Sequence, residues 1–298
     1  MRGTLNRRQS VVGALATVCA LQTVFAAQTS ERRLLQGHLV RGRASPGASI
    51  ALDNQRLRVG TEGSFVFGIA WDRRAPAMLT IRTPGCARTT RVFDIERRQY
   101  GVERIDQLPG KFVTPENREV MARVERENQL IEAARMHDTD EAWFMNEFDW
   151  PVEGDLSNSF GAQRVLNGQK RRPHFGVDIA ASEGTPVAAP QRAIVRLAAD
   201  DFYFSGGTVI LDHGHGVSTS YLHMRRIEVT AGQSVGRGQR IGAVGKTGRA
   251  TGPHLCWRLN WFQKRLDVLS VLPGASTDYT LAAANPQAQS CSKSNLMF

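Results

Sequence analysis

The stretch that decides the fold reads Gly248-Arg249-Ala250-Thr251-Gly252-Pro253-His254-Leu255-Cys256-Trp257. Two upstream segments have the same character, namely His174-Phe175-Gly176-Val177-Asp178 and Tyr221-Leu222-His223-Met224. Each sets a histidine among strand-forming residues, and two of the three also contain glycine. Pro173 and Pro253 stand directly before two of these histidines, which disfavours helix. We therefore expect three short strands that converge on one polar site.

The period of a strand gives a physical reason to group these residues. Successive side chains point to opposite faces, so residues two or four apart share a face. The pairs that meet this condition are His174 with Asp178, Tyr221 with His223, and His254 with Cys256. Each segment can therefore present two polar groups on one face while its apolar neighbours point to a core.

The first 27 residues have the pattern of an export signal. A basic start is followed by an apolar run from 11 to 25 and by the small-residue cleavage site Val24-Phe25-Ala26. The run is shorter than the roughly 20 apolar residues that span a bilayer, which disfavours a membrane anchor. We expect a mature chain that begins near Gln28 and acts in the periplasm or outside the cell.

Charge and cysteine count bear on the partners of that mature chain. Loss of the signal removes three arginines and no acidic residue, so the formal charge falls from +10 to +7, which suits an anionic polymer such as the bacterial envelope. Without an interleaved basic and aromatic motif, a nucleic-acid partner is not expected. Three cysteines remain, so at least one is unpaired or bound to something else. Cys256 is that candidate, and Cys86 with Cys291 is a candidate disulfide.

The chain divides by pattern into a mainly β protein. Short alternating runs with turn residues between them predict a small β-sandwich accessory domain over 28–100. A charged stretch over 101–147 predicts a linker with an α-helix that Thr114 caps and that ends near Met136. Glycine-rich hairpins over 148–272 predict an antiparallel, barrel-like domain, and 273–298 is a small-residue tail that we expect to be loosely ordered.

Several motifs in the third region occur in a fixed order: Ser159-Phe160-Gly161 with Arg164, His174 to Asp178 as H-x-x-x-D, Gly184-Thr185-Pro186-Val187, Asp212-His213-Gly214-His215-Gly216, Tyr221-Leu222-His223-Met224, and Thr251-Gly252-Pro253-His254-Leu255. Any one of these motifs is weak evidence, but the ordered set is strong. The region from Phe148 to Asp267 resembles the lysostaphin-type (LytM-like) zinc metallopeptidases, which cut peptide bonds of bacterial peptidoglycan. The resemblance implies one Zn²⁺ per chain and peptidoglycan as the partner.

The resemblance also implies site residues. His174 and Asp178 correspond to zinc ligands, and His223 and His254 correspond to the catalytic pair. The third ligand is normally the second histidine of an H-x-H motif, and this sequence has Cys256 there.

A cysteine at that position has two opposite interpretations. Thiolate is a good zinc ligand, and three ligands that leave one position for water are the general form of a catalytic zinc centre. A His, Asp⁻, Cys⁻ set cancels the charge of Zn²⁺, however, and makes the metal a weaker Lewis acid. The alternative is that Cys256 is a buried small hydrophobe in a metal-free domain.

Other polar residues have structural alternatives. Arg164 is a candidate to bind a substrate carboxylate or carbonyl, or to form an ion pair. Tyr221 is a candidate substrate contact because it shares the expected face of His223, but packing is an equal alternative. His213 and His215 are best explained as part of a hairpin turn, and Trp257 and Trp261 as core residues.

Two functions follow from these patterns. The first is an exported zinc endopeptidase in which the metal polarises the scissile carbonyl and His223 or His254 deprotonates a water. The second is a metal-free domain that binds peptidoglycan or activates a cell-wall amidase. The presence of His174, Asp178, His223 and His254 together favours the first function, because a decayed site has no chemical reason to keep them.

Overall fold

The computed structural model describes residues 33–45 and 47–274. The predicted signal over 1–27, the predicted tail beyond residue 274 and Cys291 lie outside the described residues, so the expected pairing of Cys86 with Cys291 does too. Among the described residues no helix is both long enough and apolar enough to cross a membrane.

The N-terminal region forms two sheets. The larger has the strand order β1-β7-β6-β3-β4, with bounds Arg33–Leu35, Thr89–Glu96, Ala77–Arg82, Ser49–Leu52 and Gln55–Leu57. The smaller pairs β2 (Leu39–Arg43) with β5 (Ser64–Gly68) in antiparallel fashion. Every residue of β5 is buried, and Phe65 and Phe67 stack with ring centroids 6.5 Å apart. Short strands separated by turn residues were the expectation for this region, and the mainly β prediction is confirmed.

The linker region holds both helix and strand. It comprises β8 (Val102–Ile105), the short α1 (Gly110–Val113), α2 (Arg118–Arg135) and the 3₁₀ turn η1 (Trp143–Met145). The predicted cap of the long helix is wrong. Thr114 ends α1, whereas Asn117 caps α2 because its side-chain oxygen accepts hydrogen bonds from the backbone N–H groups of Glu119 and Val120.

Strand β8 brings the linker to the C-terminal region. It pairs in parallel with β10 (Gln163–Leu166), and β10 pairs with β11 (Gln169–Lys170). The register places Glu103 opposite Arg164. A segment expected to act only as a connector is therefore part of a sheet that borders the polar residues.

The main body of the C-terminal region is one large sheet. Its strand order is β18-β14-β15-β16-β20-β12-β9, with bounds Ser234–Val235, Ala193–Phe202, Gly206–Asp212, Val217–Met224, His254–Trp261, Val177–Ala180 and Asp155–Asn158. Strand β21 (Lys264–Leu266) pairs with β20 in antiparallel fashion, and the 3₁₀ turn η2 (Val268–Val271) follows β21 in the chain. A small sheet of β13, β19 and β17 has the bounds Pro186–Ala188, Arg240–Ala243 and Arg226–Ile227.

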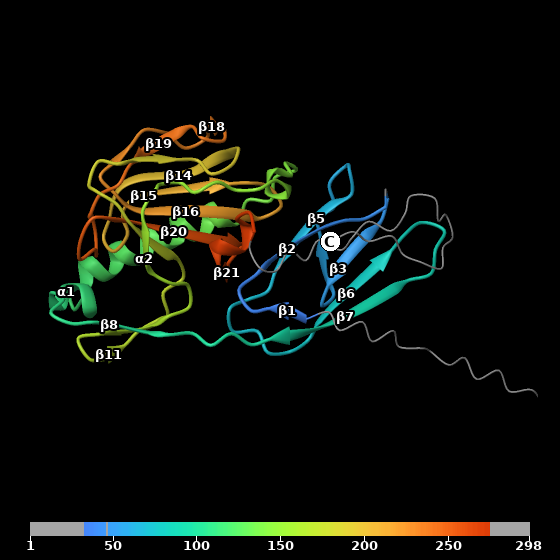
Figure 1. Ribbon diagram of the computed structural model, residues 1–298, viewed down its shortest axis with the longest axis horizontal. Coiled ribbons are helices and arrows are strands. Elements are labelled where there is room, and N and C mark those ends of the chain that lie inside the picture. The colour runs from blue at the N-terminus through green and yellow to red at the C-terminus, as the bar shows by residue number, and fades with distance from the viewer. Residues whose placement is uncertain (1–32, 46, 275–298) are drawn as a thin grey trace, which may run out of the picture. The chain divides into compact units, whose positions relative to one another are not determined.

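The long strands β14, β15, β16 and β20 lie side by side (Figure 1). Helix α2 packs against β14 and β15, and β15 and β16 are buried along their whole length. On β20 the side chains alternate, so that Leu255, Trp257 and Leu259 enter the core while the intervening residues face the other way. This alternation aims His254 and Cys256 in one direction.

Candidate metal centre

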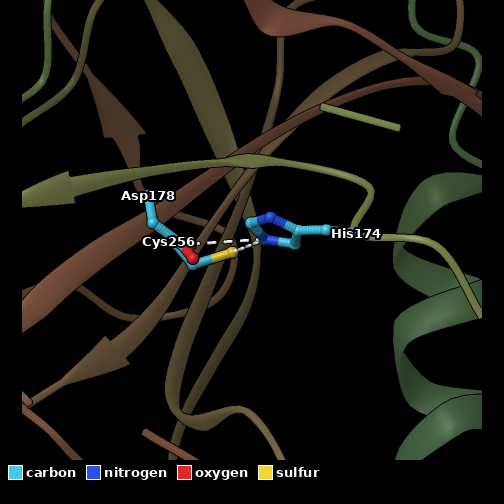
Figure 2. Close-up of side chains that lie close together, drawn as sticks. All are labelled: His174, Asp178 and Cys256. Carbon is cyan, nitrogen blue, oxygen red and sulfur yellow. Dashed lines mark hydrogen bonds and ion pairs between the residues drawn. The ribbon is translucent and has the colours of Figure 1, made fainter. Parts of the chain in front are cut away.

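Three side chains predicted as metal ligands converge in the structure (Figure 2). Asp178 on β12 lies directly opposite Cys256 on β20 in the antiparallel ladder, so their side chains share a face. His174 precedes β12, and its Nε2 lies 3.2 Å from Asp178 Oδ1 and 3.3 Å from Cys256 Sγ. The potential ligand atoms of all three residues lie within 4.8 Å of one another.

The chemistry of this cluster fits a zinc ion. All three side chains are buried, and Asp178 Oδ1 accepts no well-aligned hydrogen bond, although His174 Nε2 lies 3.2 Å from it. A buried carboxylate oxygen without a donor is costly unless a cation compensates it. One imidazole nitrogen, one carboxylate oxygen and one sulfur are all ligand types that Zn²⁺ accepts.

The pKa values of the three residues show which of them carries a proton that a metal would displace. Burial raises the pKa of the Cys256 thiol to about 12, partly offset by the charge of Arg258. Burial lowers the pKa of His174, which keeps its imidazole neutral. Burial would raise the pKa of Asp178, but its interaction with His174 and the charges around it outweigh that effect and lower it. A metal would therefore displace a proton from the thiol and none from the other two ligands.

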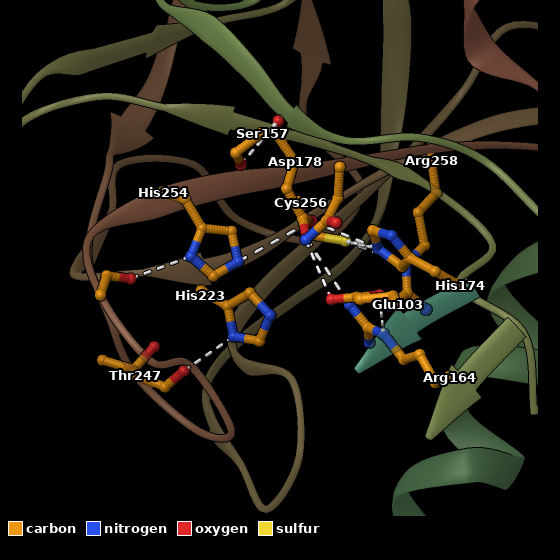
Figure 3. A network of polar contacts seen from close by, with 12 residues as sticks. Glu103, Ser157, Arg164, His174, Asp178, His223, Thr247, His254, Cys256 and Arg258 are labelled. Carbon is orange, nitrogen blue, oxygen red and sulfur yellow. Dashed lines mark hydrogen bonds and ion pairs between the residues drawn. The ribbon is translucent and has the colours of Figure 1, made fainter. Parts of the chain in front are cut away.

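The two predicted catalytic histidines lie beside this cluster (Figure 3). The rings of His223 and His254 are 4.8 Å apart between centroids. His223 Nδ1 donates to the backbone oxygen of Thr247 at 2.8 Å, and His254 Nδ1 donates to that of Gly252 at 2.9 Å. Because each Nδ1 carries the hydrogen, each neutral ring presents Nε2 as an acceptor.

His223 and His254 differ in their surroundings. Burial, reinforced by the neighbouring His254, lowers the pKa of His223 to about 3, so its ring is neutral near pH 7. His254 Nε2 lies 3.8 Å from Asp178 Oδ1. The structure thus brings both predicted catalytic residues to the same side of the predicted metal ligands.

An open groove of about 290 Å³ gives access to this site. The polar and charged side chains that line this groove are Glu103, Asn158, Arg164, Asp178, His223, Arg249 and His254. His174 and Cys256, which lie beside Asp178 in Figure 3, are not among the residues that line the groove. A ligand in the groove would meet the histidine pair and one face of the metal cluster.

Arg164 takes the ion-pair role that its sequence position had left open. Its Nε donates to Glu103 Oε2 at 2.8 Å, and its Nη2 lies 3.5 Å from Asp178 Oδ2. Asn158 Nδ2 donates to both Glu103 Oε1 and Asp178 Oδ2, at 2.9 and 3.2 Å. Arg164 still lines the groove, so its predicted contact with substrate stays a prediction.

Sequence reasoning missed Glu103, Asn158 and Arg258. Glu103 comes from a linker strand distant in sequence, and no local pattern marks it. Arg258 did carry a signal, because it lies two residues after Cys256 on the same strand and so shares its face. Its Nε donates to Cys256 Sγ at 3.3 Å.

Tyr221 requires a correction. It is fully buried, pairs with Trp257 on the core face of β20, and its hydroxyl is hydrogen-bonded to Thr219 Oγ1 at 2.9 Å. It does not share a face with His223, because His223 has a φ of 66° and the regular alternation of the strand ends there. Tyr221 is therefore a core residue, and a direct contact with substrate is excluded by its burial.

The remaining histidines and tryptophans agree with their structural interpretations. His213 and His215 lie in the turn between β15 and β16, and both ring nitrogens of His213 are occupied, by the Arg192 backbone oxygen and by Thr219 Oγ1. Trp257 and Trp261 are almost completely buried in the core.

Comparison with known proteins relates the chain to a peptidase family. The sequence pattern of peptidase family M23 matches residues 172–268. A crystal structure of a Pseudomonas aeruginosa protein described as a peptidase M23 superposes with a TM-score of 0.62 at 30% sequence identity, over 80% of this chain and 94% of that one.

Two curated relatives each match a little over a third of this chain. The peptidoglycan DD-endopeptidase ShyA of Vibrio cholerae is 42% identical over 113 residues, which are 37% of this chain and 26% of the relative. An uncharacterised metalloprotease of Haemophilus influenzae is 42% identical over 112 residues, 37% of this chain and 24% of the relative. The chain thus matches about a quarter of the length of these relatives.

Proposed function

The chain belongs to peptidase family M23, and on that premise we propose that it is a zinc endopeptidase that hydrolyses the peptide cross-links of bacterial peptidoglycan. The observation that carries the proposal is the convergence of His174, Asp178 and Cys256 beside a groove that His223 and His254 line. The name of the V. cholerae relative, a peptidoglycan DD-endopeptidase, supports this substrate class.

The three convergent residues would hold the metal. Zn²⁺ bound by His174, Asp178 and Cys256 would supply a Lewis acid for the scissile carbonyl and lower the pKa of a water molecule. Arg164 and Asn158 both contact the second oxygen of Asp178, which orients Oδ1 toward the cluster.

The two groove histidines would move the proton. Backbone carbonyls fix both rings in the tautomer whose Nε2 accepts, so either ring is prepared to take a proton from the attacking water. The same proton can then pass to the leaving amine. A ring that enters the reaction already protonated at both nitrogens would instead donate a hydrogen bond to the developing oxyanion. Because the pKa of His223 is depressed, its ring is neutral before the reaction and its Nε2 is free to accept a proton.

The remaining parts of the proposal concern where the protein works. A basic mature chain with a predicted export signal suits the bacterial envelope, where peptidoglycan carries negative charge. We propose periplasmic or secreted action for residues 28–298, with the region before the peptidase domain as an accessory module. The alternative function is binding of peptidoglycan or activation of an amidase without metal. It would use the groove as a binding site, without catalysis.

Digestion of purified sacculi tests the proposal. Residues 28–298 are incubated with sacculi, and the soluble products are identified by mass spectrometry, with and without a chelator and after zinc is restored. We expect cross-linked fragments to be cleaved within their peptides, with loss of cleavage in chelator and in His223→Ala. Binding to sacculi without peptide products under any metal condition would contradict the endopeptidase and favour the alternative function.

A further inference from the structure

The polar face of β20 continues beyond the predicted metal ligand. His254, Cys256 and Arg258 follow one another at two-residue intervals, so all three project from the same face. The Nε of Arg258 donates a hydrogen bond to Cys256 Sγ at 3.3 Å, as Figure 3 shows from close by. A guanidinium therefore touches the sulfur that the sequence has in place of the usual imidazole nitrogen.

We infer that Arg258 is a positioning residue of the metal centre, which holds the Cys256 sulfur by a charged hydrogen bond and returns the positive charge that a thiolate ligand removes. This inference rests on the proposed zinc site. It assigns to one residue the compensation that allows cysteine to serve as the third ligand.

The charges of the groups explain why such compensation matters. A site with two neutral imidazoles and one carboxylate leaves Zn²⁺ with a net charge of +1, whereas His174, Asp178 and a Cys256 thiolate leave it neutral. A guanidinium within hydrogen-bond distance of the sulfur restores one positive charge. It also stabilises the thiolate form of the sulfur, which is the form that binds zinc, because a hydrogen bond between two charged groups is stronger than one between neutral groups.

The space for this pair depends on a glycine. A Cβ atom on Gly176 would lie 2.7 Å from Arg258 Cγ and 3.2 Å from Cys256 Sγ, which is too close for either to keep its place. Gly176 lies between His174 and Asp178 in the same short segment. The segment that supplies two of the predicted ligands thus also leaves the room in which Arg258 reaches the third.

The surroundings of Arg258 contain further cations. Arg135 is buried with Nε and Nη1 unpaired, and Arg265 has a buried, unpaired Nη1. Both lie close enough for their charges to interact with Arg258. A group of buried cations is costly, and a thiolate at Cys256 offsets part of that cost. Arg258 rather than Arg265 donates to the sulfur, which makes Arg265 a matched control for loss of a nearby charge.

A double-mutant cycle on metal affinity tests the inference. Residues 28–298 and the variants Arg258→Met, Cys256→His and their combination are titrated with zinc against a chromophoric chelator, at one pH and under reducing conditions. We expect Arg258→Met to weaken zinc binding about 10-fold when Cys256 is present. In the Cys256→His background the same change should have little effect on zinc affinity, because the sulfur that accepts the hydrogen bond from Arg258 is absent.

Two further variants separate charge from geometry. Arg258→Lys keeps the charge but not the fixed guanidinium geometry and should fall between the parent and Arg258→Met. Arg265→Met should bind zinc like the parent. Thermal unfolding of each metal-free variant shows whether it is folded before its affinity is compared.

Cobalt substitution gives a readout that is independent of affinity and activity. The parent loaded with Co²⁺ should show a sulfur-to-cobalt charge-transfer band, which Cys256→His abolishes. Arg258→Met should shift this band to lower energy, because the sulfur lone pairs lose a charged donor.

The outcomes distinguish this inference from the proposed function. An equal loss of zinc affinity in the parent and Cys256→His backgrounds, or an unshifted cobalt band in Arg258→Met, would overturn the role of Arg258. A parent without a cobalt–thiolate band would overturn both the inference and the proposed zinc site. Strong coupling between Arg258 and Cys256, together with no cleavage of sacculi, would support the inference and refute only the endopeptidase.

Discussion

Both faces of strand β20 hold buried side chains, yet the two faces differ in what these side chains contact. On the core face Leu255, Trp257 and Leu259 have no exposed surface and pack among apolar residues. On the polar face Cys256 is only 1% exposed, but it meets His174, Asp178 and Arg258. Burial alone therefore does not separate structure from chemistry in this protein; the nature of the partners does.

The largest effect is expected on the polar face. His254→Ala leaves the three predicted metal ligands and the core untouched but removes one of the two groove histidines. We expect the rate of peptide cleavage to fall by about 10²–10⁴-fold, the usual contribution of a general acid or base. Rates on sacculi, measured beside the zinc content, check this, and unchanged cleavage would remove His254 from the catalytic pair.

The core face should respond in the opposite way. Leu259→Ala deletes fully buried apolar atoms and leaves a cavity, so the free energy of unfolding should fall by about 2–5 kcal/mol. The folded variant should still bind zinc as the parent does. Urea unfolding and zinc titration on the same sample test this separation, and a variant of normal stability that no longer binds zinc would break it.

These two faces also show what sequence could predict. The alternation on β20 and the turn around His213 and His215 follow from local spacing, and the structure agrees with both. His174 also reaches Asp178, but it lies before β12 and not on the shared strand face that the spacing predicted. The period of two would also have included Arg258.

Other features could not be read from local patterns. His223 has a left-handed backbone conformation, which usually requires glycine and which the sequence therefore does not indicate. The prediction that His223 and Tyr221 share a strand face was wrong for this reason. Glu103 reaches the groove only through the pairing of β8 with β10, a long-range contact without a local signal. Asn117 rather than Thr114 caps α2. Both residue types are good helix caps, so residue type alone could not decide between them, and the backbone path does.

The smallest effect concerns a histidine that is buried but has no role in the groove. Burial lowers the pKa of His213 to about 4, and both of its ring nitrogens are hydrogen-bonded. Since the folded pKa lies below the ordinary value near 6.5, the unfolded chain binds the proton more readily, and stability is lost as the pH falls from about 6.5 toward 4.

His213→Gln removes that titration and keeps polar atoms at the same place. Between about pH 7 and pH 5 the parent should lose about 2 kcal/mol more unfolding free energy than the variant. Urea unfolding at the two pH values measures the difference. An identical loss in both proteins would mean that His213 does not titrate differently in the folded and unfolded states.

The zinc content of the purified protein is the most direct test of the proposed metal centre. Residues 28–298 and the variant Cys256→Ser are prepared under reducing conditions, supplemented with zinc, freed of excess metal and measured by elemental mass analysis. We expect about one zinc per chain in the parent and a much lower content in the variant, because a serine hydroxyl is a poor substitute for a thiolate ligand. No stoichiometric zinc in the parent, or an unchanged content in Cys256→Ser, would contradict a metal centre built from His174, Asp178 and Cys256.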